Sequence, residues 1–219
     1  MIAEHSVHAH VAHHFEDAQQ QHEAVTIGMW AFLVTEVMFF GGLFLLYVIS
    51  RLQYPDAFAE ASNHLDMTLA GVNTVILLCS SLSVALAVHA AQTDRRNALV
   101  GYLLLTIVCA FLFLGLKGME YYHEYEEHLI PGLNFMFEGP LAAGVERFFV
   151  VYFVMTGVHA THMILGIGVM FVLLWQSWRG DYSSAHFSPI ELFGLYWHFV
   201  DIIWVFLFPL LYLVGRHLT

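Results

Sequence analysis

Residues 26–50 read TIGMWAFLVTEVMFFGGLFLLYVIS, in which Glu36 is the single charged side chain. A helix that crosses about 30 Å of hydrocarbon needs about 20 mostly apolar residues, and this run is long enough. Four further runs of this kind lie at 67–91, 98–119, 148–178 and 192–215. Because only helices satisfy their own backbone hydrogen bonds in lipid over such lengths, we predict an all-α fold, an integral membrane bundle of five transmembrane helices.

The composition of the whole chain agrees with a membrane protein. Of 219 residues, 59% are hydrophobic and 11% are charged, whereas about 25% are charged in ordinary soluble domains. These values exclude a disordered chain, and the net charge of −11 excludes a broad attraction to nucleic acid. The 15 histidines outnumber the 7 lysines and arginines, so the positions of the histidines become the main question about function.

Polar segments separate the five runs. Residues 51–66 contain a proline and are predicted to form a loop, and the short link QTDRRN at 92–97 makes the second and third helices an antiparallel hairpin. We therefore divide the chain into an N-terminal segment at 1–25 and a transmembrane domain at 26–219, with an acidic loop at 121–147. The glutamates of this loop are Glu124, Glu126, Glu127, Glu138 and Glu146.

The first 25 residues hold six histidines and four acidic residues but no lysine or arginine. A cleaved signal peptide needs a basic start and a cleavage site after a short apolar stretch, and neither is present. We expect a flexible, solvated segment followed by an uncleaved first span, with metal binding by the histidine-rich tract as the alternative. The basic residues divide three against four between the two sides of the membrane, so the positive-inside rule does not orient the chain.

Ionisable groups at membrane depth are costly, so they are functional candidates. Glu36 stands about ten residues into the first span, roughly 15 Å along the helix axis. Two interpretations are open for it. It is either a protonated carboxyl group hydrogen-bonded to a neighbouring helix, or a group that handles protons or binds a lipid headgroup.

Two later spans carry polar pairs three residues apart and thus on one helical face: His159 with His162, and His198 with Asp201. Together with Glu120 and the glutamate of the first span, these groups could fill a metal site of the kind found in helical bundles. Alternatively they pair with one another across helices, as polar side chains do in membranes at about 0.6 kcal/mol each. Spacing alone leaves both interpretations open.

Five separated stretches carry a family pattern. The last span contains YWHFVDIIWVFLFPLLY (196–212), and the fourth contains YFVMTGVHATHMILG (152–166). TEVMFF (35–40), NTVILLCSS (73–81) and GMEYYH (118–123) complete the set. In this order they resemble subunit III of the haem–copper respiratory oxidases, the cytochrome c and quinol oxidases, and the resemblance extends over about residues 26–215.

The resemblance implies a five-helix bacterial form that lacks the first two of the seven helices of longer members. It implies a location in the bacterial inner membrane, with the N-terminus cytoplasmic and the C-terminus and the acidic loop periplasmic. The implied function is that of a non-redox subunit of a proton-pumping terminal oxidase that reduces O₂ to water. Such a subunit stabilises the catalytic subunit, holds phospholipid and supports proton uptake. It has no catalytic residue and no metal ligand, since haem and copper belong to the partner subunits.

Site residues follow from the same resemblance. Glu36 matches the family's buried, carbodiimide-reactive carboxylate, and Arg179 is the candidate for contact with a lipid phosphate, although ungapped counting places Gln176 there. Lys117 departs from the glutamine of many members, and we expect it to pair with a glutamate of the following loop. The remaining polar positions are expected to form an interhelical network: Asn73, His89, Glu120, His159, His162, His198 and Asp201.

The expected partners are the catalytic subunit I, subunit II and a small subunit IV, with phospholipid; cytochrome c and a larger respiratory supercomplex are further candidates. The loop glutamates could steer a basic cytochrome c or be solvated without a partner, so the electron donor, cytochrome c or quinol, stays open. Two other classes also remain: an independent transporter or membrane metalloprotein, and the related accessory subunit of a nitric oxide reductase.

Overall fold

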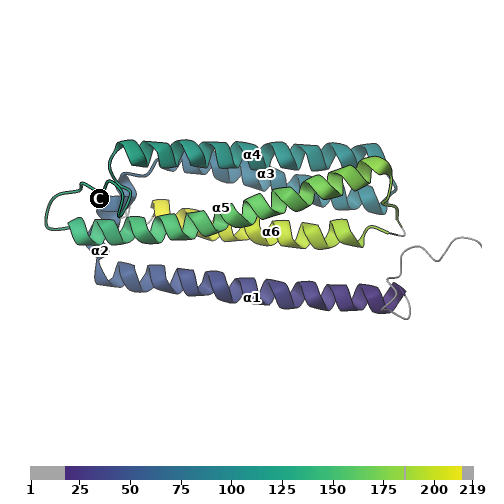
Figure 1. Ribbon diagram of the computed structural model, residues 1–219, viewed down its shortest axis with the longest axis horizontal. Coiled ribbons are helices and arrows are strands. Elements are labelled where there is room, and N and C mark those ends of the chain that lie inside the picture. The colour runs from purple at the N-terminus through teal and green to yellow at the C-terminus, as the bar shows by residue number, and fades with distance from the viewer. Residues whose placement is uncertain (1–17, 185, 214–219) are drawn as a thin grey trace, which may run out of the picture. The chain divides into compact units, whose positions relative to one another are not determined.

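The computed structural model describes residues 18–184 and 186–213, which form helices and short links (Figure 1). Within this part of the chain, five helical stretches are long and apolar enough to cross a membrane. The predicted all-α fold with five spans is therefore confirmed. The elements are α1 (Ala18–Gln53), α2 (Pro55–Asn63), α3 (Met67–Gln92), α4 (Arg96–Glu126), α5 (Ala142–Arg179), α6 (Ser188–Phe208) and the π-helical turn η1 (Pro209–Leu213).

The chain divides into two compact units, the first ending at Phe39 and the second beginning at Phe40. The described residues of the first unit form the N-terminal part of α1. In the second unit four long helices pack in a ring, because α3 and α5 each lie against both α4 and α6 (Figure 1). The short helix α2 packs against α5 and η1. Because these helices pack against one another, the polar side chains buried on them, such as Asn73 and Lys117, lie at contacts between helices.

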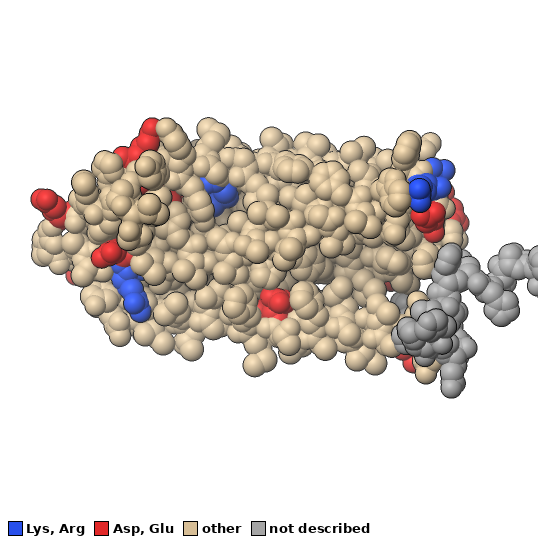
Figure 2. Space-filling model, viewed as in Figure 1, with Lys and Arg blue, Asp and Glu red and all other residues tan. Residues whose placement is uncertain are grey.

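The helices of the ring are apolar on both their inner and their outer faces. Phe113, Trp197 and Trp204 are fully buried, whereas Leu82 and Leu165 are 63% and 61% exposed. Over α4 and α5, Lys, Arg, Asp and Glu side chains gather mainly toward the helix ends (Figure 2). A helix that is apolar all round suits a lipid environment.

Polar contacts tie the links together at the end of the ring that holds the α3–α4 turn. The Asp94 carboxylate accepts a hydrogen bond from the backbone N–H of Ser184 at 2.6 Å, which joins this turn to the α5–α6 link. Hydrogen bonding by the Ser184 side chain, together with this N–H, lowers the pKa of the exposed Asp94 carboxyl. Arg96 Nε donates to the Ser177 carbonyl at 3.2 Å. Gly180 ends α5 in the left-handed conformation, which glycine adopts without steric cost.

The predicted loop at 51–66 is wrong, because the structure places α2 within it. Pro55 stands at the first helical position and Asp56 lies in the first turn, both of which favour a helix start. Ala57, Phe58 and Ala61 form its buried face. The proline that was taken as a helix breaker therefore begins a helix.

The predicted helix ends also differ from the structure. α1 begins at Ala18 instead of residue 26, and residues 1–17 of the expected N-terminal segment lie outside the described part. α4 continues to Glu126, so the acidic loop begins later than predicted. Its sequence EYYHEYE contains no glycine or proline that would end the helix. Pro209 lacks a backbone N–H, and there α6 passes into the π-helical turn.

Candidate functional site

Lys117, the single lysine of the sequence, is 5% exposed. Its ammonium group donates to Glu120 Oε2 at 3.0 Å, to the Tyr152 hydroxyl at 3.0 Å and to the Tyr212 hydroxyl at 2.8 Å. An ammonium group has three N–H donors. All the donors of Lys117 are therefore used.

Tyr152 and Tyr212 each hydrogen-bond to both Lys117 and Glu120. Each accepts a hydrogen bond from Lys117 and donates its own proton to Glu120 Oε1, Tyr152 at 3.0 Å and Tyr212 at 2.5 Å. The Glu120 carboxylate thus accepts three hydrogen bonds and forms an ion pair with the ammonium. We call Lys117, Glu120, Tyr152 and Tyr212 the Lys117 cluster. Buried charges are tolerated when they are paired and fully hydrogen-bonded, and both conditions are met here.

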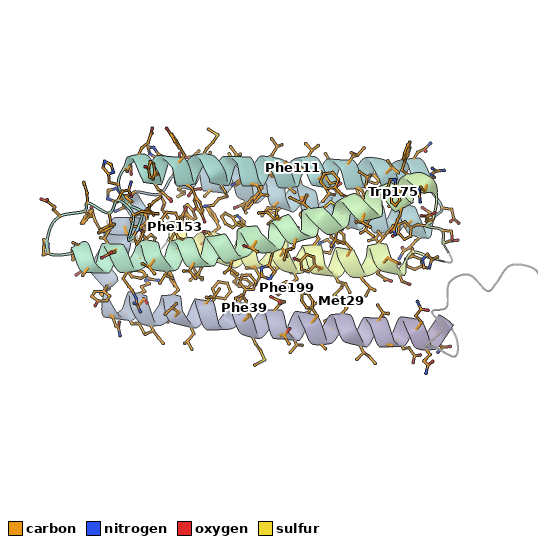
Figure 3. The ribbon with its side chains drawn as sticks, in the orientation of Figure 1. Met29, Phe39, Phe111, Phe153, Trp175 and Phe199 are labelled. Atoms are coloured by element: carbon orange, nitrogen blue, oxygen red, sulfur yellow. The ribbon has the colours of Figure 1, made fainter. Side chains whose placement is uncertain are left out.

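Aromatic rings surround the ammonium group. Four ring centroids lie 5.0 to 5.5 Å from its nitrogen, those of Tyr121, Tyr152, Trp204 and Tyr212. Rings within about 6 Å attract a cation through their quadrupoles. Phe153, labelled in Figure 3, packs on Tyr121 with 5.0 Å between centroids. The charged pair is therefore enclosed by ring faces and hydroxyl groups.

Three elements contribute to the Lys117 cluster. α4 provides Lys117 and Glu120, whose spacing of three places them on one helical face. α5 provides Tyr152, and the π-helical turn provides Tyr212. The ion pair of Lys117 is with Glu120 in the same helix and not, as predicted, with a glutamate of the following loop. The cluster can hold α4, α5 and the π-helical turn η1 together.

Glu124 lies one turn beyond Glu120 and is 2% exposed. Neither of its carboxylate oxygens has a hydrogen-bond partner within the described residues, although Lys117 and Tyr152 lie close enough to interact with it electrostatically. The sequence placed Glu124 among the loop glutamates that either steer a basic cytochrome c or are solvated. Its burial removes it from any surface that could attract a basic partner.

A second polar region lies between α3 and α6. Ser81 Oγ and His198 Nδ1 are 2.7 Å apart and share a hydrogen bond. Asp201, one turn further along α6, is 3% exposed. In the described chain neither of its oxygens has a hydrogen-bond partner, although Ser81 lies near the carboxyl group. We call Ser81, His198 and Asp201 the Asp201 region.

Indole and amide groups add three more contacts between helices. Trp197 donates to Ser80 Oγ at 2.7 Å, and Trp204 donates to Thr74 Oγ1 at 3.0 Å, so each tryptophan of α6 bonds a hydroxyl group of α3. Asn73 Nδ2 donates to a backbone carbonyl of α4 at 3.4 Å. The structure thus places Asn73 between helices.

The other histidines that were predicted to join the interhelical network lie in different surroundings. His159 is buried between the rings of Phe113 and Trp204, at centroid distances of 5.6 and 5.3 Å. His162 Nδ1 lies 2.9 Å from the Val158 carbonyl of its own helix. His89 is exposed near the end of α3, away from the interior of the ring. In the described part of the chain, His89, His159 and His162 therefore have separate contacts and share no common site.

The two residues predicted to contact lipid lie in different units. Glu36 stands near the middle of α1, in the first unit. Arg179 is exposed at the last residue of α5, and its guanidinium carbon lies 3.7 Å from the ring centroid of Trp175, which is labelled in Figure 3.

Possible metal ligands do not gather in the described part of the chain. Among residues 18–184 and 186–213, no group of three or more His, Cys, Asp or Glu side chains could hold a metal ion. The two pairs of polar residues that lie three apart on α5 and α6 do not meet at one site. His159 contacts aromatic rings, whereas His198 bonds Ser81. The geometry therefore favours hydrogen bonding and packing between helices.

Sequence reasoning missed Tyr152 and Tyr212. Each lies in an apolar run, where a tyrosine is easily taken for a packing residue. A buried lysine in the neighbouring span was the available signal, because its three donors need acceptors. Which tyrosines supply them depends on packing and could not be derived from spacing.

Five apolar spans, with polar side chains that bond one helix to the next, define a polytopic membrane protein. A family model described as cytochrome c oxidase subunit III matches residues 5–216, so the chain belongs to that family. It is 29% identical over 211 residues to cytochrome c oxidase subunit 3 of Litocranius walleri, Gazella saudiya and Nanger dama. Each comparison covers 93% of this chain and 73% of the relative. The predicted resemblance is confirmed, and the protein is a subunit of a haem–copper oxidase complex.

Proposed function

We propose that this chain is a non-redox subunit III that stabilises the catalytic subunit of a proton-pumping terminal oxidase, holds phospholipid and supports proton uptake. One observation carries the proposal. The buried charges of the Lys117 cluster are satisfied within the subunit, and its hydrogen bonds fix the positions of three elements. Such an interior suits a rigid accessory subunit, and haem and copper then belong to the partner chains.

Phospholipid binding is supported at the α5 terminus. Arg179 is exposed beside Trp175. Tryptophan is enriched at the membrane–water interface, and a guanidinium group there can contact a lipid phosphate in bidentate fashion. In this proposal Arg179 binds the headgroup, and the exposed apolar side chains of the long helices contact acyl chains.

The proposed partners are subunit I, subunit II and a small subunit IV in a bacterial inner membrane, with the N-terminus cytoplasmic and the C-terminus periplasmic. The proposed acidic surface for a basic cytochrome c, or for a larger respiratory assembly, consists of the exposed Glu126, Glu127, Glu138 and Glu146. Long-range attraction of this kind weakens as salt screens it. Removing these charges should therefore slow association mainly at low ionic strength.

The test uses the purified oxidase complex. Metal and haem analysis should assign every redox centre to another chain, and a stoichiometric metal bound through His159 or His162 would overturn the proposal. Glu36→Gln should leave the initial rate of O₂ reduction nearly unchanged but alter lipid retention or shorten the lifetime during turnover. An immediate and complete loss of electron transfer would instead place Glu36 in the chemical site.

A further inference from the structure

An open groove of about 370 Å³ lies at the end of α1 and the start of α5, away from the Lys117 cluster, with which it shares no residue. Most of its lining side chains are polar. The lining consists of Gln53, Tyr54, Glu146 and Arg147, together with Ala143 and Val150. Because Arg147 directly precedes the apolar run at 148–178, we place the groove at the membrane–water interface, where basic and tyrosine side chains are favoured.

Arg147 is a cation without a carboxylate partner in the described part of the chain. Its Nε donates to the Oγ of Ser50, a buried residue of α1, at 3.4 Å, and this bond ties the guanidinium group to the wall of the groove. A guanidinium group has five N–H donors. The four on its terminal nitrogens have no acceptor within residues 18–184 and 186–213. They can bind a phosphate group in bidentate fashion.

Glu146 adds the opposite charge to the groove. It is exposed, and within residues 18–184 and 186–213 it forms no ion pair. Consecutive residues of a helix do not face each other, so the carboxylate of Glu146 and the guanidinium of Arg147 stand at separate points. A second cavity, which adjoins the groove at Tyr54 and Ala143, brings the carboxylate of Asp56 close by. The groove therefore offers one cation and, apart from it, carboxylates.

Apolar side chains extend from the charged part of the groove toward the middle of the span. Val150 and Val154 follow Arg147 at intervals of three and four residues, on the same helical face, and both are exposed. A ligand that lies along this face needs a charged end against Arg147 and an apolar body against the valines. A soluble phosphate compound would leave the valines uncovered. A membrane lipid has both parts.

The two signs of charge select the headgroup. An anionic headgroup would bind Arg147 but would bring its negative charge close to Glu146 and Asp56. A choline headgroup has no N–H with which to bond a carboxylate. A headgroup with both a phosphate and a primary ammonium group meets every requirement, because the phosphate accepts from Arg147 and the ammonium donates to Glu146.

We propose that this groove binds a zwitterionic phospholipid with a primary ammonium group, of the phosphatidylethanolamine type. Arg147 holds the phosphate, Glu146 holds the ammonium, and an acyl chain lies along the valines of α5. The site goes beyond the lipid contact proposed at Arg179. The two arginines are 32 residues apart in α5, which is about 48 Å along the axis and more than the roughly 30 Å of hydrocarbon, so the two sites face opposite leaflets.

Native mass spectrometry of the intact oxidase complex tests the selectivity. The complex is equilibrated in nanodiscs that contain phosphatidylethanolamine and phosphatidylglycerol in equal amounts, and the phospholipids that stay bound are then identified. Glu146→Gln should lower the bound ratio of phosphatidylethanolamine to phosphatidylglycerol several-fold, because it removes both the acceptor of the ammonium and the repulsion of an anion. Glu138→Gln removes an exposed glutamate outside the groove and should leave the ratio unchanged. An unchanged ratio in Glu146→Gln, or an equal fall in both variants, would overturn the proposal.

Further measurements protect this result. The gain of phosphatidylglycerol in Glu146→Gln cannot come from misfolding, which would release both lipids. Arg147→Gln should release the bound phospholipid, and retention of the same number of phospholipids would contradict the proposal. Arg179→Gln tests the lipid contact of the proposed function independently, because both charges of the groove remain. A density map of the complex should show a phospholipid headgroup within hydrogen-bond distance of the Arg147 guanidinium; a side chain of another subunit in that place would overturn the proposal.

Discussion

The Lys117 cluster and the Asp201 region lie in the same unit, yet their hydrogen bonding differs. In the cluster every donor of Lys117 is used and Glu120 accepts three bonds. In the Asp201 region, His198 bonds Ser81, while the Asp201 carboxyl has no hydrogen-bond partner in the described chain. We therefore expect two equally buried charged residues to contribute differently to stability. The number of bonds that the removal of each would break is the better guide.

Breaking the ion pair of the cluster should have the largest effect. Lys117→Met leaves the Glu120 carboxylate buried without its cation, which costs about 3–5 kcal/mol. The check is the temperature at which the subunit leaves the purified complex. Replacing both partners, as Lys117→Met with Glu120→Gln, removes both charges and should recover a large part of the loss. A double variant as unstable as the single variant would contradict this account.

Packing between α5 and α6 should come next. A Cβ atom at Gly166 would lie 2.7 Å from Trp197 Cζ3, so Gly166→Ala forces the helices apart at a cost of about 1–3 kcal/mol. Gly168 has open space at that position, and Gly168→Ala should be neutral or slightly stabilising because alanine favours a helix. Both are compared by the same release temperature. Equal losses would show that close approach at Gly166 does not hold α6.

A smaller effect is expected in the Asp201 region. Asp201→Asn keeps the size of the side chain and breaks no hydrogen bond with the described residues, so it should change stability by less than about 1 kcal/mol. The same change from carboxylate to amide at Glu120 is the matched control, and it should cost more. If Asp201→Asn proves the more damaging of the two, the carboxylate has a strong partner beyond the bonds seen in residues 18–184 and 186–213, and the expectation is wrong.

The smallest effect concerns Asp94. Hydrogen bonds from the Ser184 side chain and from the Ser184 N–H lower the pKa of the carboxyl below the ordinary value of 3.8. This stabilising contribution is fully present above pH 3.8 and is lost as the pH falls through the lowered pKa. Protection of the Ser184 amide from hydrogen exchange should therefore decrease below about pH 4. Asp94→Asn should show no such step, whereas a step that persists would assign it to another group.

Much of the fold could be predicted from sequence, because the five runs are long and apolar enough to form membrane-spanning helices. α2 was missed because its buried Phe58 lies in a polar segment that contains a proline. The end of α4 was misplaced because glutamates were taken as a sign of a loop. Polar residues such as Glu120 and His198 could be selected by the cost of burying them. The partners of these residues could not be predicted. Tyr212, which bonds Glu120 and Lys117, is positioned by the π-helical turn, and residue spacing does not predict such a turn.

The short turn between α3 and α4 has a consequence for the biogenesis of the protein. Three residues join the two helices, and such a link reaches about 10 Å. The helices therefore cannot enter the bilayer at distant places and find each other later. We expect them to insert together as a hairpin, in which Ser83 can donate to the Tyr102 carbonyl, a bond of 2.8 Å in the folded chain. The hairpin would then offer the surface that α5 and α6 contact in the folded bundle.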